Sequence, residues 1–239
     1  MPPKYDVAGL GNAIMDVIAA VDDQFLLDQG IAKGAMTLID EFRAEELHRA
    51  LSHSVQAAGG SAANTMAGIA SLGGRAVFLG KVCDDVLGAR FGESLKSLGV
   101  HYPTARASGG SPTASSMIAV TPDGQRSMNT YLGACREMTP DDVDADEIAV
   151  AKILYIEGYL WDAHDAKQAS RKAMRAAKGA GAQVALSLSD SFCVGRFRDE
   201  FHDLLQNDRD SLFANEDEAK SLFETEDFAI VTEHLKARG

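Results

Sequence analysis

Residues 59–64 read Gly-Gly-Ser-Ala-Ala-Asn, and small and apolar residues continue from there to Ala70. Two adjacent glycines permit positive φ angles and let a ligand or a second backbone come close. Ser61 is a helix-capping residue type, so we expect a helix here, with its free N–H groups and positive dipole end facing whatever lies over the glycines. Alone, such a stretch is more typical of an ordinary loop and helix start. An Asn-x-x-x-Asp pair upstream and a β-hairpin downstream favour a functional interpretation.

Strands and helices alternate on both sides of this stretch. Short apolar runs indicate strands, and longer amphipathic runs closed by glycine indicate helices. Such alternation predicts an α/β fold with a mainly parallel central sheet and helices on both of its faces. The expected strands are 5–11, 14–21, 34–39, 75–82, 152–158, 183–189 and 211–214, and the expected helices are 24–29, 41–51, 61–72, 84–98, 163–181, 197–205, 216–223 and 232–238.

The composition is that of an ordinary globular protein. The 239 residues, 46% of them hydrophobic, suit one large domain with a sizeable core. The formal net charge of -12 argues against nucleic-acid binding, and no apolar stretch approaches the length of a membrane span. The N-terminus shows no signal peptide. We therefore expect a cytoplasmic protein whose Cys83, Cys135 and Cys193 are buried and reduced, rather than paired in disulfides or bound to zinc.

Two polar residues follow the first expected strand. Asn12 and Asp16 would lie at its carboxyl end, in the crevice where open α/β sheets bind ligands. An Asp beside an Asn offers acceptors and donors to a pair of adjacent hydroxyls, as on a sugar. A turn-forming Asn and an exposed strand Asp explain the same residues equally well. A dinucleotide-binding loop is excluded because its third glycine would fall at Ile14, and no Gly-x-x-x-x-Gly-Lys-Ser/Thr loop occurs.

A second β section interrupts the alternation. The runs 113–121 and 125–132 flank a Pro-Asp-Gly turn, and Asp-Gly between two such runs is a strong hairpin signal. An inserted hairpin can cover a site or be plain decoration, and both interpretations stay open. Arg136 follows the hairpin and could reach a phosphate, although an isolated surface Arg more often forms a salt bridge.

Five motifs, taken in order, resemble the ribokinase-like sugar and nucleoside kinases, often called the PfkB family. They are Gly-Leu-Gly-Asn-Ala-x-x-Asp at 9–16, Gly-Gly-Ser-Ala-Ala-Asn at 59–64, Thr-Pro-Asp-Gly-Gln-Arg at 121–126, Ser-Leu-Ser-Asp at 187–190 and Asn-Glu-Asp-Glu at 215–218. Each motif is weak alone, but five in the right order over nearly the whole chain are specific. Tyr-Leu-Gly-Ala at 131–134 and Ser-Leu-Ser at 187–189 look more like the adenosine kinase branch than like ribokinase or phosphofructokinase.

This resemblance implies a ribokinase-like fold with one domain over 1–239 and a small β lid from about 14–39 and 113–132. It implies transfer of the γ-phosphate of ATP to a primary hydroxyl of a nucleoside or sugar, with adenosine favoured and ribose or fructose as alternatives. ATP and Mg²⁺ are the implied cofactors. The implied substrate-binding residues are Asn12, Asp16, Gly59, Gly60 and Asn64, with the two glycines also forming the hinge of the lid. Arg136 would steady the phosphates, and Asn215 and Glu218 would organise Mg²⁺ through its waters.

One signature of the family is missing. Its Gly-Ala-Gly-Asp, whose Asp takes the hydroxyl proton, occurs nowhere in the 239 residues, since Gly-Ala-Gly at 179–181 is followed by Ala182. We therefore expect a C-terminally incomplete kinase that is inactive in this form and has no catalytic base of its own. The alternative is a non-catalytic sugar- or nucleoside-binding or regulatory fragment. An uncovered sheet edge, or the lid, would then favour a homodimer.

Overall fold

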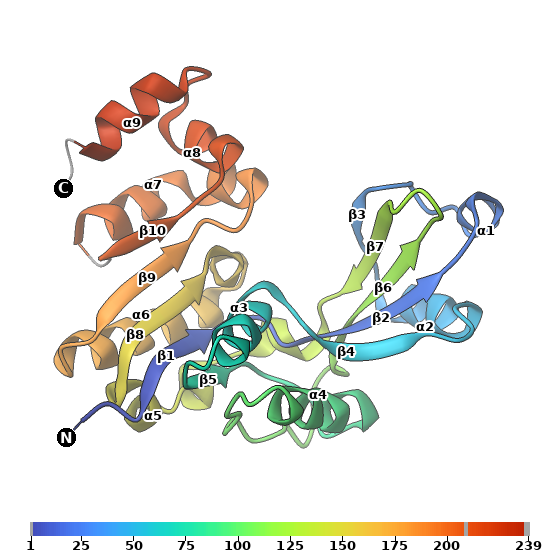
Figure 1. The fold of residues 1–239 in the computed structure, drawn as a ribbon, viewed down its shortest axis with the longest axis horizontal. Coiled ribbons are helices and arrows are strands. Elements are labelled where there is room, and N and C mark those ends of the chain that lie inside the picture. Colours follow the sequence, from blue (N-terminus) through green and yellow to red (C-terminus); the bar gives the residue numbers. More distant parts are fainter. Residues whose placement is uncertain (1, 208–209, 237–239) are drawn as a thin grey trace.

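The computed structural model describes residues 2–207 and 210–236, which form two β-sheets surrounded by helices (Figure 1). The larger, central sheet has the strand order β10-β9-β8-β1-β5, and every neighbouring pair in it is parallel. Its strands are β1 (Tyr5–Leu10), β5 (Ala76–Leu79), β8 (Ala151–Glu157), β9 (Gln183–Ser187) and β10 (Ser211–Phe213). The predicted parallel central sheet is therefore confirmed.

Helices cover both faces of the central sheet. Successive residues of a strand point to opposite faces, so β5 places Val77 in one apolar cluster and Phe78 in the other. Phe78 packs with α3 and α4, whereas Val77 shares its cluster with α5, α6 and α7. The described helices are α1 (Asp23–Asp28), α2 (Glu41–Ala50), α3 (Ser61–Ser71), α4 (Val86–Ser97), α5 (Ala145–Ala149), α6 (His164–Gly179), α7 (Ser191–Asn207), α8 (Glu216–Phe223) and α9 (Phe228–Lys236), with the 3-10 helices η1 (Gly133–Glu137), η2 (Pro140–Asp142) and η3 (Gly158–Asp162).

The second sheet projects away from the central one (Figure 1). Its strand order is β3-β7-β6-β2-β4, with β2–β6 and β3–β7 parallel and β6–β7 and β2–β4 antiparallel. The strands are β2 (Ile14–Ala20), β3 (Met36–Leu38), β4 (Val55–Gly59), β6 (Ala114–Val120) and β7 (Arg126–Tyr131). Strands from both ranges expected for a lid lie in this sheet. β4 joins them although no strand was predicted at residues 55–59.

Four passages of chain join the two sheets, and each contains glycine. Gly11 lies between β1 and β2, Gly60 lies between β4, which ends at Gly59, and α3, residues 109–110 precede β6, and Gly133 follows β7. Gly60, Gly110 and Gly133 have φ of 93°, 96° and 40°, a region that side chains strongly disfavour. The geometry between the two sheets therefore depends on these passages and on the contacts that hold them.

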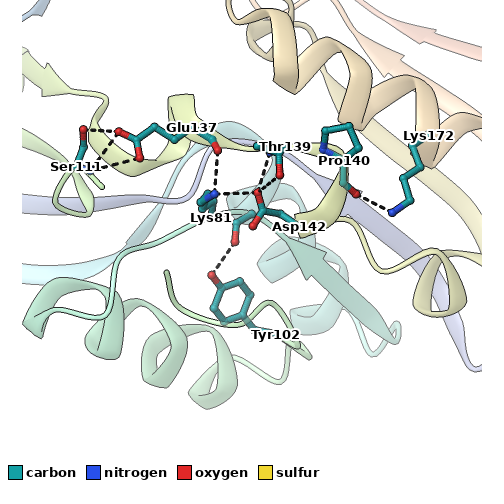
Figure 2. A network of polar contacts seen from close by, with 9 residues as sticks. Lys81, Tyr102, Ser111, Glu137, Thr139, Pro140, Asp142 and Lys172 are labelled. Atoms are coloured by element: carbon teal, nitrogen blue, oxygen red, sulfur yellow. Dashed lines mark hydrogen bonds and ion pairs between the residues drawn. The ribbon is translucent and has the colours of Figure 1, made fainter. Parts of the chain in front are cut away.

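A network of polar contacts ties the passage after β7 to the rest of the molecule (Figure 2). Lys81 donates to the Glu137 carbonyl at 2.9 Å and to Asp142 Oδ2 at 3.0 Å, and the same Oδ2 accepts the Thr139 N–H at 2.7 Å. Lys172 of α6 donates to the Pro140 carbonyl at 2.7 Å. Because Lys81 and Asp142 are mostly buried, their ion pair is shielded from water and holds η2 against the end of β5.

Several predicted boundaries are wrong. The helix expected at 197–205 matches the second part of α7, but the part from Ser191 to the kink at Phe197, whose φ and ψ of -124° and 27° are not helical, was not predicted. The last helix, expected at 232–238, begins at Phe228, and residues 237–238 lie outside the described residues. The 3-10 helices and α5 were not predicted, because elements of three to five residues carry little periodicity.

The structure gives the state of the three cysteines and the character of the described helices. Cys83, Cys135 and Cys193 are free thiols, and the last two are buried, whereas Cys83 is only half-buried. Burial raises the pKa of the Cys193 thiol to about 12, so it stays protonated and inert. Among the described residues, no helix is both long enough and apolar enough to cross a membrane.

Candidate functional site

The carboxyl of Asp16 and the diglycine meet at the base of the second sheet. β2 and β4 pair antiparallel, with Ile14 opposite Gly59 and Asp16 opposite Ala57. A Cβ built on Gly59 would lie 2.3 Å from Asp16 Cγ and 2.4 Å from its Oδ2, which is far inside ordinary contact. Position 59 therefore carries no side chain because the Asp16 carboxyl occupies that space.

Gly60 brings the Asn12 backbone to the same place. Its φ is 93°, and a Cβ on it would lie 2.3 Å from the Asn12 carbonyl oxygen. Gly60 is also the N-cap of α3, with no side-chain cap, so the predicted capping by Ser61 is wrong: Ser61 is the first residue inside the helix. The first helical bond runs from the Asn64 N–H to the Gly60 carbonyl at 2.9 Å, and the Asn64 side chain is exposed.

A carboxylate that was not predicted from the sequence joins these segments. Glu157 ends β8 and is 0% exposed. Its Oε1 accepts the Asn12 N–H at 2.7 Å, and its Oε2 accepts the Ala62 N–H at 2.9 Å. The expectation that the first N–H groups of α3 are free for a ligand is thus wrong at Ala62. The available signal was a charged residue directly after the apolar run 153–156, which is unusual in a buried parallel strand.

Burial raises the pKa of both carboxyl groups of this region. Burial raises the pKa of Asp16 to about 6, although the Arg126 guanidinium opposes the shift. Burial raises the pKa of Glu157 to about 7, against the two backbone N–H bonds that favour its ionised form. Asp16 is therefore a half-buried acceptor that is open to a ligand, whereas Glu157 is fully buried with both oxygens engaged, and the charge of each changes near neutral pH.

Polar and apolar residues are segregated on the face of the second sheet that carries Asp16. Asp16 lies opposite Ser116 of β6, and Ser116 Oγ shares a hydrogen bond of 2.9 Å with Thr130 Oγ1. The register places Ile18 and Met128 on the same face, with Ile18 two residues beyond Asp16 and Met128 two residues before Thr130. A small polar corner thus borders an apolar surface.

The remaining predicted residues do not join this cluster. Asn215 and Glu218 form a capping box at the start of α8: Asn215 Oδ1 accepts the Glu218 N–H at 2.8 Å, and Asn215 Nδ2 donates to Glu218 Oε1 at 2.8 Å. α8 follows β10, which β8 and β9 separate from β1. Arg136 lies exposed in η1 and forms no ion pair with any residue of the described ranges.

A carboxylate and an amide oxygen are donors that Mg²⁺ accepts, so Asn215 and Glu218 fit the metal chemically. Burial raises the pKa of Glu218, and its carboxylate is mostly buried within its own cap, which favours contact through water over direct coordination. Within the described part of the chain, no group of three or more His, Cys, Asp or Glu side chains is arranged to hold a metal ion.

Comparisons with known proteins agree on one family. Residues 8–238 match the sequence profile described as pfkB family carbohydrate kinase. The structure is similar to the crystal structure of adenosine kinase from Sinorhizobium meliloti, with a TM-score of 0.88 and 53% identity over 98% of this chain and 72% of that one. The α/β prediction, with a mainly parallel sheet between helices, is confirmed by this match.

Curated relatives act on different substrates. Guanosine-inosine kinase of Escherichia coli (strain K12) is 26% identical over 226 residues, which cover 90% of this chain and 52% of that protein. Probable fructokinase-4 of Arabidopsis thaliana is 34% identical over 130 residues, which cover 54% of this chain and 40% of that protein. The chain therefore spans about half or less of the length of these curated relatives.

Proposed function

This chain belongs to the pfkB family of carbohydrate kinases, and from that premise we propose that its crevice holds a nucleoside or sugar whose primary hydroxyl receives the γ-phosphate of ATP. The observation that carries the proposal is the meeting of the Asp16 carboxyl with Gly59. An ionised carboxylate accepts hydrogen bonds from two adjacent hydroxyls, and a glycine beside it lets a ring lie directly on the backbone.

Each residue of the cluster has a distinct part in this proposal. Asp16 accepts the hydroxyl hydrogens, and Asn12, on the same passage, lies within reach of the same ring. Gly59 and Gly60 form the floor, and Asn64, whose side chain is exposed at the start of α3, borders it. Phosphoryl transfer requires mainly positioning and charge neutralisation, so fixing the acceptor is the contribution that this part of the chain makes.

A nucleoside fits the surface of the second sheet that borders Asp16 better than a bare sugar does. The strand next to β7 exposes Met36 and Leu38 by 49% and 59%, and the Asp16 face also holds Ile18 and Met128. An apolar surface beside a hydroxyl-binding corner suits a ligand with a flat base at one end and a ribose at the other. The adenosine and guanosine-inosine kinases among the relatives are consistent with that preference.

ATP and Mg²⁺ are the proposed cofactors. Bound Mg²⁺ would neutralise phosphate charge during transfer. On this chain Asn215 and Glu218 would hold its waters, and Arg136, exposed and unpaired among the described residues, would contact the phosphates. We further propose a cytoplasmic location, which the three free thiols support.

Calorimetric titration tests the function most directly. At pH 8, adenosine, guanosine, ribose and fructose are each titrated into the chain and into an Asp16→Asn variant, which keeps the shape but loses the charge. We expect a nucleoside to bind the unaltered chain and to bind the variant at least tenfold more weakly. Equal affinity for both proteins would refute the role of Asp16.

A second candidate function is binding without turnover. It requires only the crevice that Asp16 and Gly59 form in the described residues. Incubation of the chain with ATP, Mg²⁺ and the tightest-binding ligand separates the two candidates. Phosphorylated product in excess of enzyme supports a kinase, whereas tight binding with no product supports a binding module.

A further inference from the structure

Glu157 connects two of the four passages between the sheets. It stands at the end of β8, which has a parallel neighbour on each side and is therefore held firmly. Its partners Asn12 and Ala62 lie 145 and 95 residues away in sequence, one after β1 and the other at the start of α3. A Cβ on Gly11 would lie 2.6 Å from Glu157 Oε2, so the close approach of the first passage also requires glycine.

Among the residues that the structure describes, no cationic side chain forms an ion pair with this carboxylate. The titratable groups that interact with it are the Cys135 and Cys193 thiols and the Tyr159 hydroxyl, and none of these carries positive charge. Within the described ranges the Asn12 and Ala62 backbone N–H groups donate to it, the Asn12 side chain also favours its ionised form, and the positive end of α3 lies beside Ala62. Its ionised form is therefore compensated by donors that belong to the passages themselves.

We propose that Glu157 is a positioning residue, whose carboxylate fixes the passage after β1 and the start of α3 relative to each other so that Asp16 and Gly59 stay in contact. The inference rests on the proposed function of the crevice. Glu157 is fully buried and both of its oxygens are engaged, so it acts through the backbone rather than on a ligand. Asn12 is fixed on one side by its N–H on Glu157, and its carbonyl oxygen lies so close to Gly60 that a Cβ there would be 2.3 Å away.

The other two passages contain a matched control. Glu137 accepts the Ser111 N–H at 3.1 Å and the Ser111 hydroxyl at 2.5 Å, and a Cβ on Gly110 would lie 2.3 Å from Glu137 Oε2. Figure 2 shows this pair at the edge of the Lys81 network. Glu137 is exposed, so water can replace its hydrogen bonds when they are lost.

The test uses Glu157→Gln and Glu137→Gln in the full chain. A glutamine at 157 turns one acceptor oxygen into an NH₂ group, which faces a backbone N–H and leaves it without an acceptor. We expect Glu157→Gln to melt cooperatively, to lose at least tenfold in hydrogen-exchange protection at Asn12 or Ala62, and to bind the nucleoside at least tenfold more weakly. Glu137→Gln should leave the hydrogen-exchange protection of Asn12 and Ala62 and the affinity for the nucleoside unchanged.

Two outcomes would overturn the proposal: unchanged protection of both amides in folded Glu157→Gln, or unchanged ligand affinity alongside lost protection. If the variant does not fold, an NMR pH titration of the unaltered protein still tests the proposal. Its Asn12 and Ala62 ¹⁵N–¹H shifts should titrate together near pH 7, and amide shifts that do not change between pH 5.5 and 8.5 contradict the inference. A chain that binds no nucleoside or sugar at all refutes the proposed function, while the amide measurements decide whether Glu157 joins the two passages.

The pH profile of affinity separates positioning from a merely structural role. Asp16, which faces Arg126, and Glu157, which faces the thiols and the tyrosine named above, both gain a proton as the pH falls. The unaltered protein should lose affinity in two steps, near pH 7 and near pH 6. Glu157→Gln should keep only the lower step, and an unchanged profile would refute the coupling.

Discussion

Substituting Gly59 by Ala probes the contact on which the site depends. The added methyl group would lie 2.3 Å from Asp16 Cγ, 2.4 Å from Oδ2 and 2.5 Å from Oδ1. Ordinary contacts begin at 3.4 Å, so the overlap with all three atoms is about 1 Å. Asp16 is half-buried and β4 is paired to β2, so the side chain must rotate or the strands must separate.

The free-energy cost of rotating the Asp16 side chain or of separating the strands can be worked out. Forcing an extra methyl group into a packed site costs about 1–3 kcal/mol, and an off-rotamer Asp costs about 0.5–1.5 kcal/mol. A displaced carboxylate loses its charged hydrogen bonds to the ligand, each of which is worth about 1.5–3 kcal/mol. We therefore expect Gly59→Ala to lower the free energy of unfolding by about 1–3 kcal/mol and to weaken nucleoside binding by about one to two orders of magnitude.

Gly68→Ala is the matched control. Gly68 lies in α3, eight residues after the N-cap Gly60, and a Cβ on it would meet no atom within 4 Å. Alanine is the better helix former by about 0.5–1 kcal/mol, so this variant should be more stable and should bind as the unaltered chain does. Urea unfolding and calorimetry measure both variants. Normal affinity in a folded Gly59→Ala protein would refute the assignment of Asp16 to the ligand.

Four further predictions follow from other contacts. Burial raises the pKa of Glu157 from 4.5 to about 7, so the stability that its protonated form contributes is complete below about pH 4.5 and is lost as the pH rises through 7. The unfolding free energies of the unaltered chain and of Glu157→Gln should therefore diverge by about 3 kcal/mol between pH 4.5 and 7. Parallel curves for the two proteins would contradict this. Lys81→Met leaves the mostly buried Asp142 without its cation and should cost about 1–3 kcal/mol in urea unfolding. Asn215→Ala removes the cap of α8 and should cost about 1 kcal/mol in Mg²⁺-free buffer. Phe213, 56% exposed on the edge strand β10, predicts self-association that sedimentation velocity would detect and that Phe213→Lys would abolish.

The elements that were predicted correctly have local causes. Apolar runs of four to seven residues indicated the central strands, because a parallel strand buried on both faces needs apolar residues at nearly every position. The Asp-Gly turn indicated the β6–β7 hairpin, because few sequences adopt that turn. The contact of Asp16 with the diglycine was predicted from the order of motifs together with the family resemblance, and neither residue alone required it.

The elements that were missed have distant causes. β4 reads Val-Gln-Ala-Ala-Gly, which has weak strand propensity. It forms because β2 supplies an antiparallel partner, in which Asp16, 41 residues earlier, lies opposite Ala57. Glu157 has no local signal for its role, because both of its partners are backbone groups far away in sequence. Backbone N–H groups exist at every residue, so the sequence does not mark which ones a buried carboxylate will reach.

The N-terminus of α3 is capped in a way that fixes its placement at the expense of folding stability. Ser61 was expected to satisfy the first N–H groups locally, and a local cap of that kind stabilises a helix by about 1 kcal/mol. The structure uses Glu157 at Ala62 instead, and burying a carboxylate without a cation opposes folding by several kcal/mol, as its raised pKa reflects. Stability therefore favours the serine. A cap supplied by β8, however, fixes α3 to the central sheet and to Asn12 at once, which a serine within the helix cannot do. The arrangement is understandable only if the placement of Gly59, Gly60 and Asp16 matters more than the free energy that is lost.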